Sequence, residues 1–355
     1  MSARPDLLLV SLGTTLGWRV ADSRFLEGAE AAGASTAAVA VGQGASGRLR
    51  RAYPVNDLVE AVAARRTAQQ ALERLHPRSV VFSTSTAAML APGIELPYAV
   101  RLDGPAALNR PGPLNAPVRT LERRALARAR LVLPWSEPAR AALPEGSAAA
   151  VVLPPPVESS GAREGDELLA VAYVPDPKAK GLDVVVDAWA QAAVEGARLE
   201  VFAVEPERAE RHLRRHGLTL PPSAALRGVV SQTEFRSALR RARVLVAGAR
   251  WEDFGQAPLE ALADGALLAT VPTPGPFAAL PLARELEPRL VASEISAGAL
   301  ALCVRAAFAL SPERAEALRE SAAELLAPLR AEALVSRLHD EVLPRLLPTF
   351  ARTRG

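Results

Sequence analysis

Short apolar runs alternate with segments of helical period through the first half of the chain. The helical segments repeat apolar residues every three or four positions, as between residues 55 and 75. The apolar runs cover residues 7–12, 36–42, 79–83, 98–102, 130–136 and 148–154. Fully apolar strands that alternate with helices are typical of a parallel sheet covered on both faces. The pattern predicts a doubly wound α/β domain over residues 1–157.

The same alternation restarts after a segment that fits neither element. Residues 154–167, PPPVESSGAREGDE, are dense in proline, glycine, serine and charge, and they predict an interdomain linker at 158–166. A second parallel α/β domain is predicted over residues 167–332. Its apolar runs lie at residues 167–174, 197–205, 224–230, 243–249, 266–272 and 289–293.

The remaining C-terminal tail is predicted to be helical from Ser296 to about Leu347. Proline cannot continue a helix without a break or kink, so we expect interruptions at Pro328 and Pro344. The last helix, about 333–350, is expected to pack back on the first domain.

Length and composition fit two ordinary domains and exclude several classes of protein. A chain of 355 residues suits two domains of about 150 to 200 residues. The net charge of +3 is small, so nucleic acid is not implied as a partner. The first apolar run is too short for a signal-peptide core or a membrane span, so we expect a cytoplasmic protein. The single cysteine, Cys303, lies in an apolar helical stretch and excludes a disulfide framework or a cysteine metal site.

Lysine is rare in this chain and confined to one place. Of 42 basic residues only two are lysine, Lys178 and Lys180. Chance clustering is one explanation. The other is a loop that requires a compact ammonium group rather than a planar guanidinium, as phosphate sites often do.

The strongest local motif is RWEDFGQAPLEALADG at residues 250–265, directly after an apolar run. Glu252 is expected at the carboxyl end of a strand, where open α/β sheets bind ligands. Gly255 allows the backbone to turn close to a ligand, and Glu260 is expected inside the helix that includes Pro258. Two carboxylates across a strand–loop–helix junction can reach two hydroxyl-bearing parts of one extended ligand. The alternative is a solvated loop charge and a glutamate favoured by the helix dipole.

A second motif, AYVPDPKAKGLD at residues 172–183, follows the first strand of the second domain. Lys180 and Gly181 open a helix predicted over residues 182–192, so an ammonium group and a helix N-terminus converge at the same rim. This combination suits a diphosphate group. Solvated lysines in a turn are the alternative.

These two motifs resemble the donor site of glycosyltransferase family 4, a retaining family with the GT-B fold. Glu252 and Glu260, with Phe254-Gly255 after the first, match the family's Glu-x7-Glu pattern, and the Lys-Gly-Leu-Asp loop precedes them. The resemblance covers about residues 168–274 in detail and the first domain only in layout. It implies two Rossmann-like domains with a cleft between them. It also implies transfer of a hexose-type sugar from a nucleotide-diphosphate donor to an acceptor hydroxyl, with no metal and no cofactor.

The resemblance implies a role for each matching residue of the second domain. Lys180, followed by Gly181, is expected at the donor diphosphate, and Glu260 at the ribose hydroxyls. Glu252 is expected to hold the donor sugar, together with the backbone of Asp253, Phe254 and Gly255. Lys180 and Glu252 are therefore the leading candidates for catalytic residues.

The chain departs from the family pattern near both ends of the predicted donor site. An arginine usually precedes the lysine in a Gly-Arg pair, and this chain has Tyr173-Val-Pro there, so Lys178 is expected to substitute. In the first domain, Gly13 and Gly17 resemble the glycine-bearing loop whose amides approach the donor phosphates. Trp18-Arg19 follows in place of the usual Gly-Gly pair.

The first domain offers three further candidates. Where the family often has a histidine near the transferring sugar, this chain has Asp103, which could bind an acceptor hydroxyl or stabilise an oxocarbenium-like centre. A structural aspartate that caps the following turn is an equal alternative. Asn109 and Arg110 in the next loop could line the acceptor site. The acceptor could be a glycan, a lipid-linked sugar or a small molecule.

Three other patterns suggest functions that their context does not support. GQGASG at residues 42–47 matches a dinucleotide motif, but no clear helix follows it. His212 and His216 have metal-ligand spacing, but arginines surround them, which disfavours a cation. The basic segment Arg119 to Arg130 is expected to be a solvated helix face over a packed stripe, or else a patch that touches acidic lipid headgroups at the inner face of a membrane.

Other interpretations of the whole chain stay open. An inverting transferase or a nucleotide-sugar epimerase would share the two-domain layout. A catalytically silent subunit that binds a sugar nucleotide would explain the missing arginine and the aspartate at position 103. A nicotinamide-dependent oxidoreductase would depend on the GQGASG segment alone.

Overall fold

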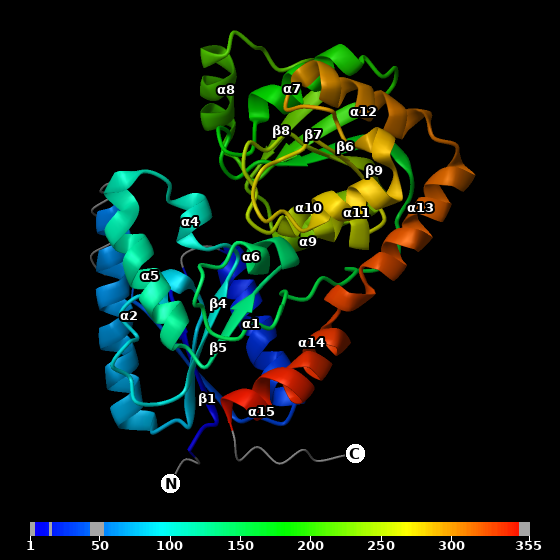
Figure 1. Cartoon of the computed structure of the whole chain (residues 1–355). Coiled ribbons are helices and arrows are strands. Elements are labelled where there is room, and N and C mark those ends of the chain that lie inside the picture. Colours follow the sequence, from blue (N-terminus) through cyan, green and yellow to red (C-terminus); the bar gives the residue numbers. More distant parts are fainter. Residues whose placement is uncertain (1–3, 14–15, 43–52, 348–355) are drawn as a thin grey trace. The chain divides into compact units, whose positions relative to one another are not determined.

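The computed structural model describes residues 4–13, 16–42 and 53–347, and the chain divides into two compact units. Unit 1 comprises Met1–Pro156 and Leu329–Gly355, and unit 2 comprises Val157–Pro328. Each unit contains one five-stranded parallel sheet with helices on both faces (Figure 1). The predicted class, two parallel doubly wound α/β folds, is confirmed.

The sheet of unit 1 has the strand order β2-β1-β3-β4-β5. Its strands are β1 (Leu7–Ser11), β2 (Thr36–Ala40), β3 (Ser79–Phe82), β4 (Tyr98–Leu102) and β5 (Leu131–Pro134). All neighbouring strands are parallel. The direction of winding reverses between β1 and β3, which is the flavodoxin-like arrangement of a doubly wound sheet.

Successive residues of the strands in unit 1 enter two different cores, as the two-residue period of a strand requires. Leu8 and Val10 of β1 join a core with α2 (Tyr53–Leu75) and α5 (Ala116–Arg128). Leu7 and Leu9 join a core with α1 (Leu16–Ala31) and the C-terminal helices. Short helices α3 (Ser85–Ala88), α4 (Ala106–Asn109) and α6 (Glu137–Ala141) follow β3, β4 and β5.

The C-terminal helices belong to unit 1 and pack against α1 (Figure 1). They are α14 (Ala331–Arg337), a π-helical turn (Leu338–Val342) and α15 (Leu343–Leu346). Pro344 lacks the N–H that would continue the α-helical ladder, which accounts for the widened turn before it. Pro328 lies in a short 3-10 helix (Ala327–Leu329) that separates α14 from α13 (Pro312–Leu325). Both predicted interruptions are therefore present.

The sheet of unit 2 has the order β10-β9-β6-β7-β8. Its strands are β6 (Glu167–Tyr173), β7 (Arg198–Phe202), β8 (Ala224–Gly228), β9 (Ala242–Ala247) and β10 (Leu267–Thr270). Counted within the unit from β8, this is the Rossmann order 3-2-1-4-5. The winding reverses between β6 and β9, so the loops that follow these two strands flank the switch point.

Seven helices cover the two faces of this sheet. They are α7 (Leu182–Ala192), α8 (Pro206–Arg215), α9 (Gln232–Arg241), α10 (Gln256–Ala263), α11 (Ala279–Leu286), α12 (Ala297–Ala309) and α13 (Pro312–Leu325). Helices α7, α8 and α12 share one apolar core, which includes the buried Cys303. Helices α9 and α10 contact β9 on the other face (Figure 1).

Two predicted strands are absent from the described residues. Residues 148–154 run beside β5 and exchange two hydrogen bonds with Val132, but they form only an isolated bridge at Ala150. Three prolines follow, and they have no N–H groups with which to extend a ladder. Residues 289–293 also form only a bridge, at Val291, because the segment enters through a 3-10 turn (Pro288–Leu290).

Candidate active site

Lys180 and Glu252 meet at the carboxyl edge of the sheet in unit 2. Lys180 lies in the loop after β6, and Glu252 lies in the loop after β9. The Lys180 Nζ atom donates a hydrogen bond to Glu252 Oε1 at 2.6 Å. Because β6 and β9 are the strands between which the winding reverses, this pair lies where open α/β sheets bind ligands. Two residues 72 positions apart in the sequence are thus joined.

The pair is partly shielded from water and still reachable from it. The Lys180 side chain is 24% exposed and the Glu252 side chain 14%. Burial raises the pKa of Glu252, and the ammonium group of Lys180 offsets part of this rise. An anion that approaches Lys180 would compete with Glu252 for the same N–H groups.

Arg250 connects the two loops, a role that the sequence analysis did not assign. Its backbone N–H donates to the Ala179 carbonyl at 2.9 Å, and its guanidinium donates to the Lys178 carbonyl at 3.1 Å. The same guanidinium binds both carboxylate oxygens of Asp183 at the start of α7, at 2.9 and 2.5 Å. An arginine next to a glutamate motif gives no sequence signal for such a contact, because Asp183 is 67 residues away.

Gly181 and Gly255 are required by the close packing of these loops. Gly181 has φ of 62°, and a Cβ atom there would lie 2.0 Å from the Gly248 carbonyl oxygen. Gly255 has φ of 81°, and its Cβ would lie 2.5 Å from the Phe277 ring. The left-handed backbone disfavours any side chain at either position. Both glycines cap the helices that follow them, α7 and α10.

The loop of Glu252 is also bound to the loop after β10. The Glu252 N–H donates to the Pro274 carbonyl, and the Ala278 N–H donates to the Phe254 carbonyl, both at 3.1 Å. The Trp251 indole donates to Asp253 Oδ1 at 2.9 Å. These bonds fix the backbone of residues 251–255, which the sequence analysis expects at the donor sugar.

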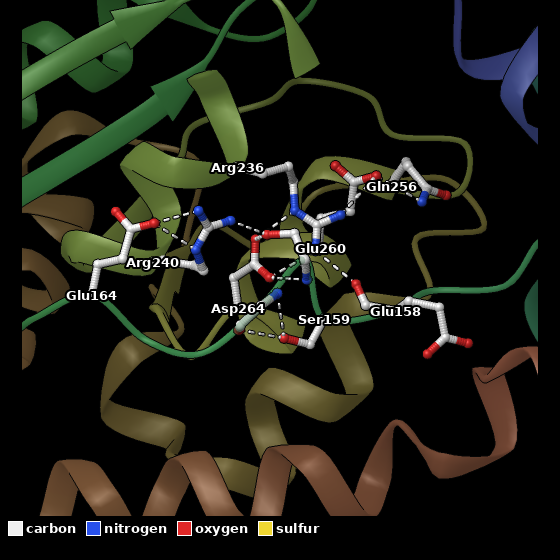
Figure 2. Close-up of polar contacts among 10 residues, drawn as sticks. Glu158, Ser159, Glu164, Arg236, Arg240, Gln256, Glu260 and Asp264 are labelled. Carbon is white, nitrogen blue, oxygen red and sulfur yellow. Dashed lines mark hydrogen bonds and ion pairs between the residues drawn. The ribbon is translucent and has the colours of Figure 1, made fainter. Parts of the chain in front are cut away.

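Glu260 lies in α10, as predicted, and faces a charged network (Figure 2). It is only 7% exposed. Gln256 donates to its Oε1 atom at 3.1 Å, and the Arg236 guanidinium lies 3.6 Å from the same atom. Burial raises the pKa of Glu260, and Arg236 opposes this rise. Arg236 comes from a separate helix, α9, and is not predicted from the sequence.

Arg236 also binds Asp264, and through it the segment predicted as a linker is held on unit 2. Arg236 donates twice to the Asp264 carboxylate, at 2.5 and 2.8 Å. The Ser160 N–H and hydroxyl donate to the same carboxylate at 2.7 and 3.0 Å. Arg236 further donates to the Glu158 carbonyl at 2.7 Å (Figure 2). The first part of residues 158–166 is therefore bound to α9 and α10 rather than being a free tether.

Lys178 does not share the surroundings of Lys180. Its side chain lines a separate pocket with residues of α8, and neither Lys180 nor Glu252 lines that pocket. Near it, Asp183, His212 and His216 place one ligand atom each within 4.8 Å of one another. The sequence analysis disfavours a metal at the two histidines. Arg250 strengthens that argument, since a cation there would compete with its guanidinium for Asp183.

The predicted glycine loop of unit 1 is described only in part. Gly13 follows β1 with φ of 57°, and its carbonyl accepts a hydrogen bond from Arg19 at 3.0 Å. Residues 14–15 lie outside the described residues. Gly17 is not in the loop, contrary to the prediction, because α1 already begins at Leu16. The GQGASG segment lies almost wholly outside the described residues as well.

The other candidates of unit 1 surround β4 and α4. Asp103 is half-buried in the bend directly after β4, one strand away from the switch point of its sheet. Asn109 ends α4. Arg110 follows it and donates to Asp57 of α2 at 2.9 Å. The predicted basic helix is α5, on which Arg123, Arg124 and Arg128 are exposed. Within the residues that the structure describes, no helix is both long and apolar enough to cross a bilayer.

Comparisons with known proteins agree with this fold. Residues 165–327 match the family model described as "Glycosyl transferases group 1". No curated protein sequence matches the chain. Among solved structures, the chain is similar to sucrose-phosphate synthase from Thermosynechococcus elongatus, with a TM-score of 0.73 and 15% identity over 95% of this chain and 97% of that chain.

Two further solved structures have comparable similarity. The Anabaena HepE protein in complex with UDP and glucose has a TM-score of 0.70 and 12% identity, over 94% of this chain and 97% of that chain. WaaG, a glycosyltransferase involved in lipopolysaccharide biosynthesis, has a TM-score of 0.67 and 16% identity, over 95% and 99%.

Together these findings define the class of protein. The structural likenesses show the fold, which is GT-B. The family model of the group 1 glycosyl transferases matches residues 165–327, just under half of the chain, and on this match and fold the chain is a glycosyltransferase. The predictions of this fold and of this class of enzyme are confirmed.

Proposed function

We propose that the chain is a retaining, metal-independent glycosyltransferase of family 4, which transfers a hexose-type sugar from a nucleotide-diphosphate donor bound on unit 2. The observation that carries the proposal is the contact of 2.6 Å between Lys180 Nζ and Glu252 Oε1 at the β6/β9 switch point. The motif residues predicted for the diphosphate and the sugar are neighbours there. The Anabaena HepE structures, which contain UDP with glucose or UDP-glucose, give the donor class further support.

In this proposal, different residues of unit 2 bind different parts of the donor. Lys180 leaves Glu252 for the diphosphate when the donor binds, and it then compensates the charge of the leaving group without a divalent metal. The N-terminus of α7, which begins after Gly181, adds favourable backbone charge. Glu252 and the fixed backbone of residues 253–255 hold the sugar.

Glu260 is proposed to accept hydrogen bonds from the ribose hydroxyls. Burial raises the pKa of Glu260, and the adjacent Arg236 guanidinium opposes that rise because a nearby cation favours the charged form. An ionised carboxylate is a strong acceptor for hydroxyl donors. On unit 1, the amide of Gly13 is proposed to approach the donor phosphates, and Asp103 to bind an acceptor hydroxyl or stabilise an oxocarbenium-like centre. Asn109 and Arg110 are proposed to line the acceptor site.

A second candidate function is a catalytically silent subunit that binds a sugar nucleotide. One observation favours it. Where the family usually has an arginine before the lysine, Tyr173 packs its ring on Phe235, with ring centroids 4.8 Å apart. Donor binding without release of the nucleotide in the presence of acceptors would identify this function.

A thermal-shift screen tests the proposal. The purified chain is heated with UDP, GDP, ADP and their sugars, with and without a chelator. A ligand at 100 times its Kd stabilises the folded state by about 2.7 kcal/mol, so one nucleotide should raise Tm by several degrees regardless of chelator.

Two variants make the screen specific. Glu260→Gln removes the proposed ribose acceptor and should lose most of the shift. Glu320→Gln removes the same charge from the exposed face of α13 and should keep it. A shift that needs a divalent metal would contradict metal independence, and no shift with any nucleotide would contradict the donor site.

We also propose a cytoplasmic enzyme that contacts acidic lipid headgroups through the exposed arginines of α5. The packed side of this helix is buried at Val118, Ala125 and Leu126, which leaves its cations for the outer face, and Leu114 just before the helix adds an exposed apolar side chain. Cosedimentation with anionic vesicles should fall when Arg123, Arg124 and Arg128 are replaced by glutamine. Unchanged cosedimentation would contradict this contact.

A further inference from the structure

A small pocket of about 250 Å³ lies between the loop after β6 and one face of α8. Its lining consists of Asp176, Pro177, Lys178, Arg208, Arg211, His212 and Arg215. The four residues from α8 have the spacing i, i+3, i+4 and i+7, so they share one helix face. Pockets for drug-sized ligands have volumes of roughly 300–1,000 Å³, so this pocket suits a smaller group.

Only one carboxylate lines the pocket, and it already has partners. Asp176 Oδ2 accepts a hydrogen bond from Arg208 at 2.7 Å. Asp176 Oδ1 accepts the N–H groups of Lys178 and Ala179, at 3.0 and 2.8 Å. The backbone hydrogen bond from Ala179, above all, keeps the pKa of Asp176 below its usual value. Asp176 therefore stays ionised and balances Arg208 alone.

Three cations of the lining are left without a counter-charge. The side chains of Lys178, Arg211 and Arg215 make no hydrogen bond or ion pair within the part of the chain that the structure describes. Like charges held close together repel each other, and a bound anion would remove that cost. Guanidinium and ammonium groups also have the donor geometry that phosphate oxygens require.

The same helix supplies a contrast. Arg214 does not line the pocket, and it pairs with Glu210 at 3.4 Å. Its neighbours Arg211 and Arg215 have the same side chain and no such partner. On the pocket face of α8, Arg208 and His212 have acidic partners, whereas Arg211 and Arg215 have none in the described residues.

The walls of the pocket are held in place by the rest of unit 2. Ala209 and Leu213 anchor α8 in the core. His212 Nε2 lies 3.0 Å from Asp183 Oδ1, and Asp183 is bound by Arg250. The opposite wall is fixed by the two backbone bonds to Asp176. Because α8 and the loop of Asp176 are already held in place, a ligand would have to order few groups on binding, and this favours affinity.

We propose that this pocket is a second anion site of the enzyme, which binds the phosphate group of a soluble phosphate ester other than the donor diphosphate. Its ligand would be an acceptor or an effector that carries a phosphate. A lipid headgroup fits less well, because surfaces that bind membranes combine cations with exposed apolar side chains. The apolar side chains of α8, Ala209 and Leu213, are both buried.

Calorimetric titration of the full chain with inorganic phosphate, and with glucose 6-phosphate as a phosphate ester, tests the proposal. Arg211→Gln and Arg215→Gln each remove one unpaired cation from the pocket. A hydrogen bond to a charged group is strong enough that we expect Kd to rise about tenfold or more in each. Arg214→Gln removes the same charge outside the pocket and should change Kd by less than about twofold.

Two further variants locate the bound phosphate. Lys178→Gln alters the opposite wall and should also weaken binding about tenfold, which covers the case in which a helix variant fails to fold. Lys180→Met should leave phosphate affinity unchanged, because Lys180 does not line the pocket. No phosphate binding by the unaltered chain, equal binding by the pocket variants and Arg214→Gln, or loss of binding in Lys180→Met would each overturn the proposal.

A vesicle experiment separates the two sources of phosphate. Cosedimentation with phosphatidylcholine vesicles that contain phosphatidic acid is compared for the unaltered chain and the double variant Arg211→Gln/Arg215→Gln. We expect no difference between them. Vesicle binding that depends on these two arginines, with no binding of either soluble phosphate, would overturn the proposal in favour of a lipid headgroup.

Discussion

The two units are built from the same parts, yet they use their buried charges differently. In unit 2 the pairs Lys180–Glu252 and Arg250–Asp183 lie in loops at the carboxyl edge of the sheet, where ligands can reach them. In unit 1 the main buried pair, Arg101–Asp22, lies inside the layer between β4 and α1. A charged pair at a sheet edge can exchange its partner for a ligand. An enclosed pair can only hold the fold together.

The Arg101–Asp22 pair is buried, and all but one of the guanidinium nitrogens of Arg101 have a hydrogen-bond partner among the described residues. Arg101 is 2% exposed, and it donates to Asp22 at 2.5 Å and to the Ala21 carbonyl at 3.0 Å. Its guanidinium carbon lies 4.6 Å from the centre of the Phe25 ring. Burial lowers the pKa of Arg101, and Asp22 offsets part of this effect. Only its Nε atom lacks a hydrogen-bond partner within the described residues.

The largest change in the free energy of unfolding should come from breaking the Arg101–Asp22 pair. Asp22→Ala leaves a buried guanidinium without its counter-charge, which typically costs about 3–5 kcal/mol. We expect that loss in the free energy of unfolding, measured with urea, and an unchanged nucleotide affinity in the protein that remains folded. Glu27→Gln on the same helix breaks an exposed pair and should cost less than about 1 kcal/mol. If both variants lost a similar free energy of unfolding, the enclosed pair would matter no more for folding than an exposed one, which would contradict the contrast drawn between the units.

At the sheet edge the expected effect is on binding rather than on folding. Lys180→Met removes a charged donor worth about 1.5–3 kcal/mol, so nucleotide affinity should fall roughly tenfold to a hundredfold with little change in Tm. Lys178→Met is the matched variant, because it removes the only other lysine of the chain. We expect it to leave nucleotide affinity unchanged in calorimetric titration. An equal loss would instead place both lysines at the diphosphate, as the sequence analysis predicts.

Replacing Asp183 should cause a smaller loss of folding stability. This residue lies at the start of α7 and binds Arg250 in the loop after β9. Burial opposes its ionisation, but hydrogen bonds from Arg250 and His212 lower its pKa to about 2. A folded-state pKa below the unfolded value adds stability above about pH 4, and this stability is lost as the pH falls toward 2. Asp183→Asn should therefore cost about 2 kcal/mol at pH 7, measured by urea unfolding, and progressively less at lower pH. Asp187→Asn removes the same charge at a half-buried position of the same helix that has no arginine partner among the described residues, and it should cost less than about 1 kcal/mol at pH 7.

The periodicity of the sequence was enough to predict both sheets, because fully buried strands and amphipathic helices leave strong apolar patterns. It failed at residues 148–154 and 289–293, where apolar residues are buried without ladder partners. Hydrophobicity reports burial, while prolines nearby decide whether backbone N–H groups can pair.

For the candidate site, motifs predicted Lys180 and Glu252, which the structure brings together, and missed the residues that support them. Lys180 and Glu252 are recognisable from their neighbours in the chain. Arg250 and Arg236 act through contacts with Asp183 and Asp264, which come from other parts of unit 2. Such contacts depend on tertiary structure alone. A single sequence cannot distinguish these two arginines from the many others on the surface.

The C-terminal helices give unit 1 an unusual order of assembly on the ribosome. Leu334, Leu338, Val342 and Leu346 complete an apolar core whose other half is encoded within the first 156 residues. All of unit 2 must be synthesised before these side chains emerge. Until then, Phe25 and the neighbouring strands present an uncovered apolar face to chaperones and to other nascent chains. The time needed to synthesise unit 2 therefore sets how long this face stays uncovered.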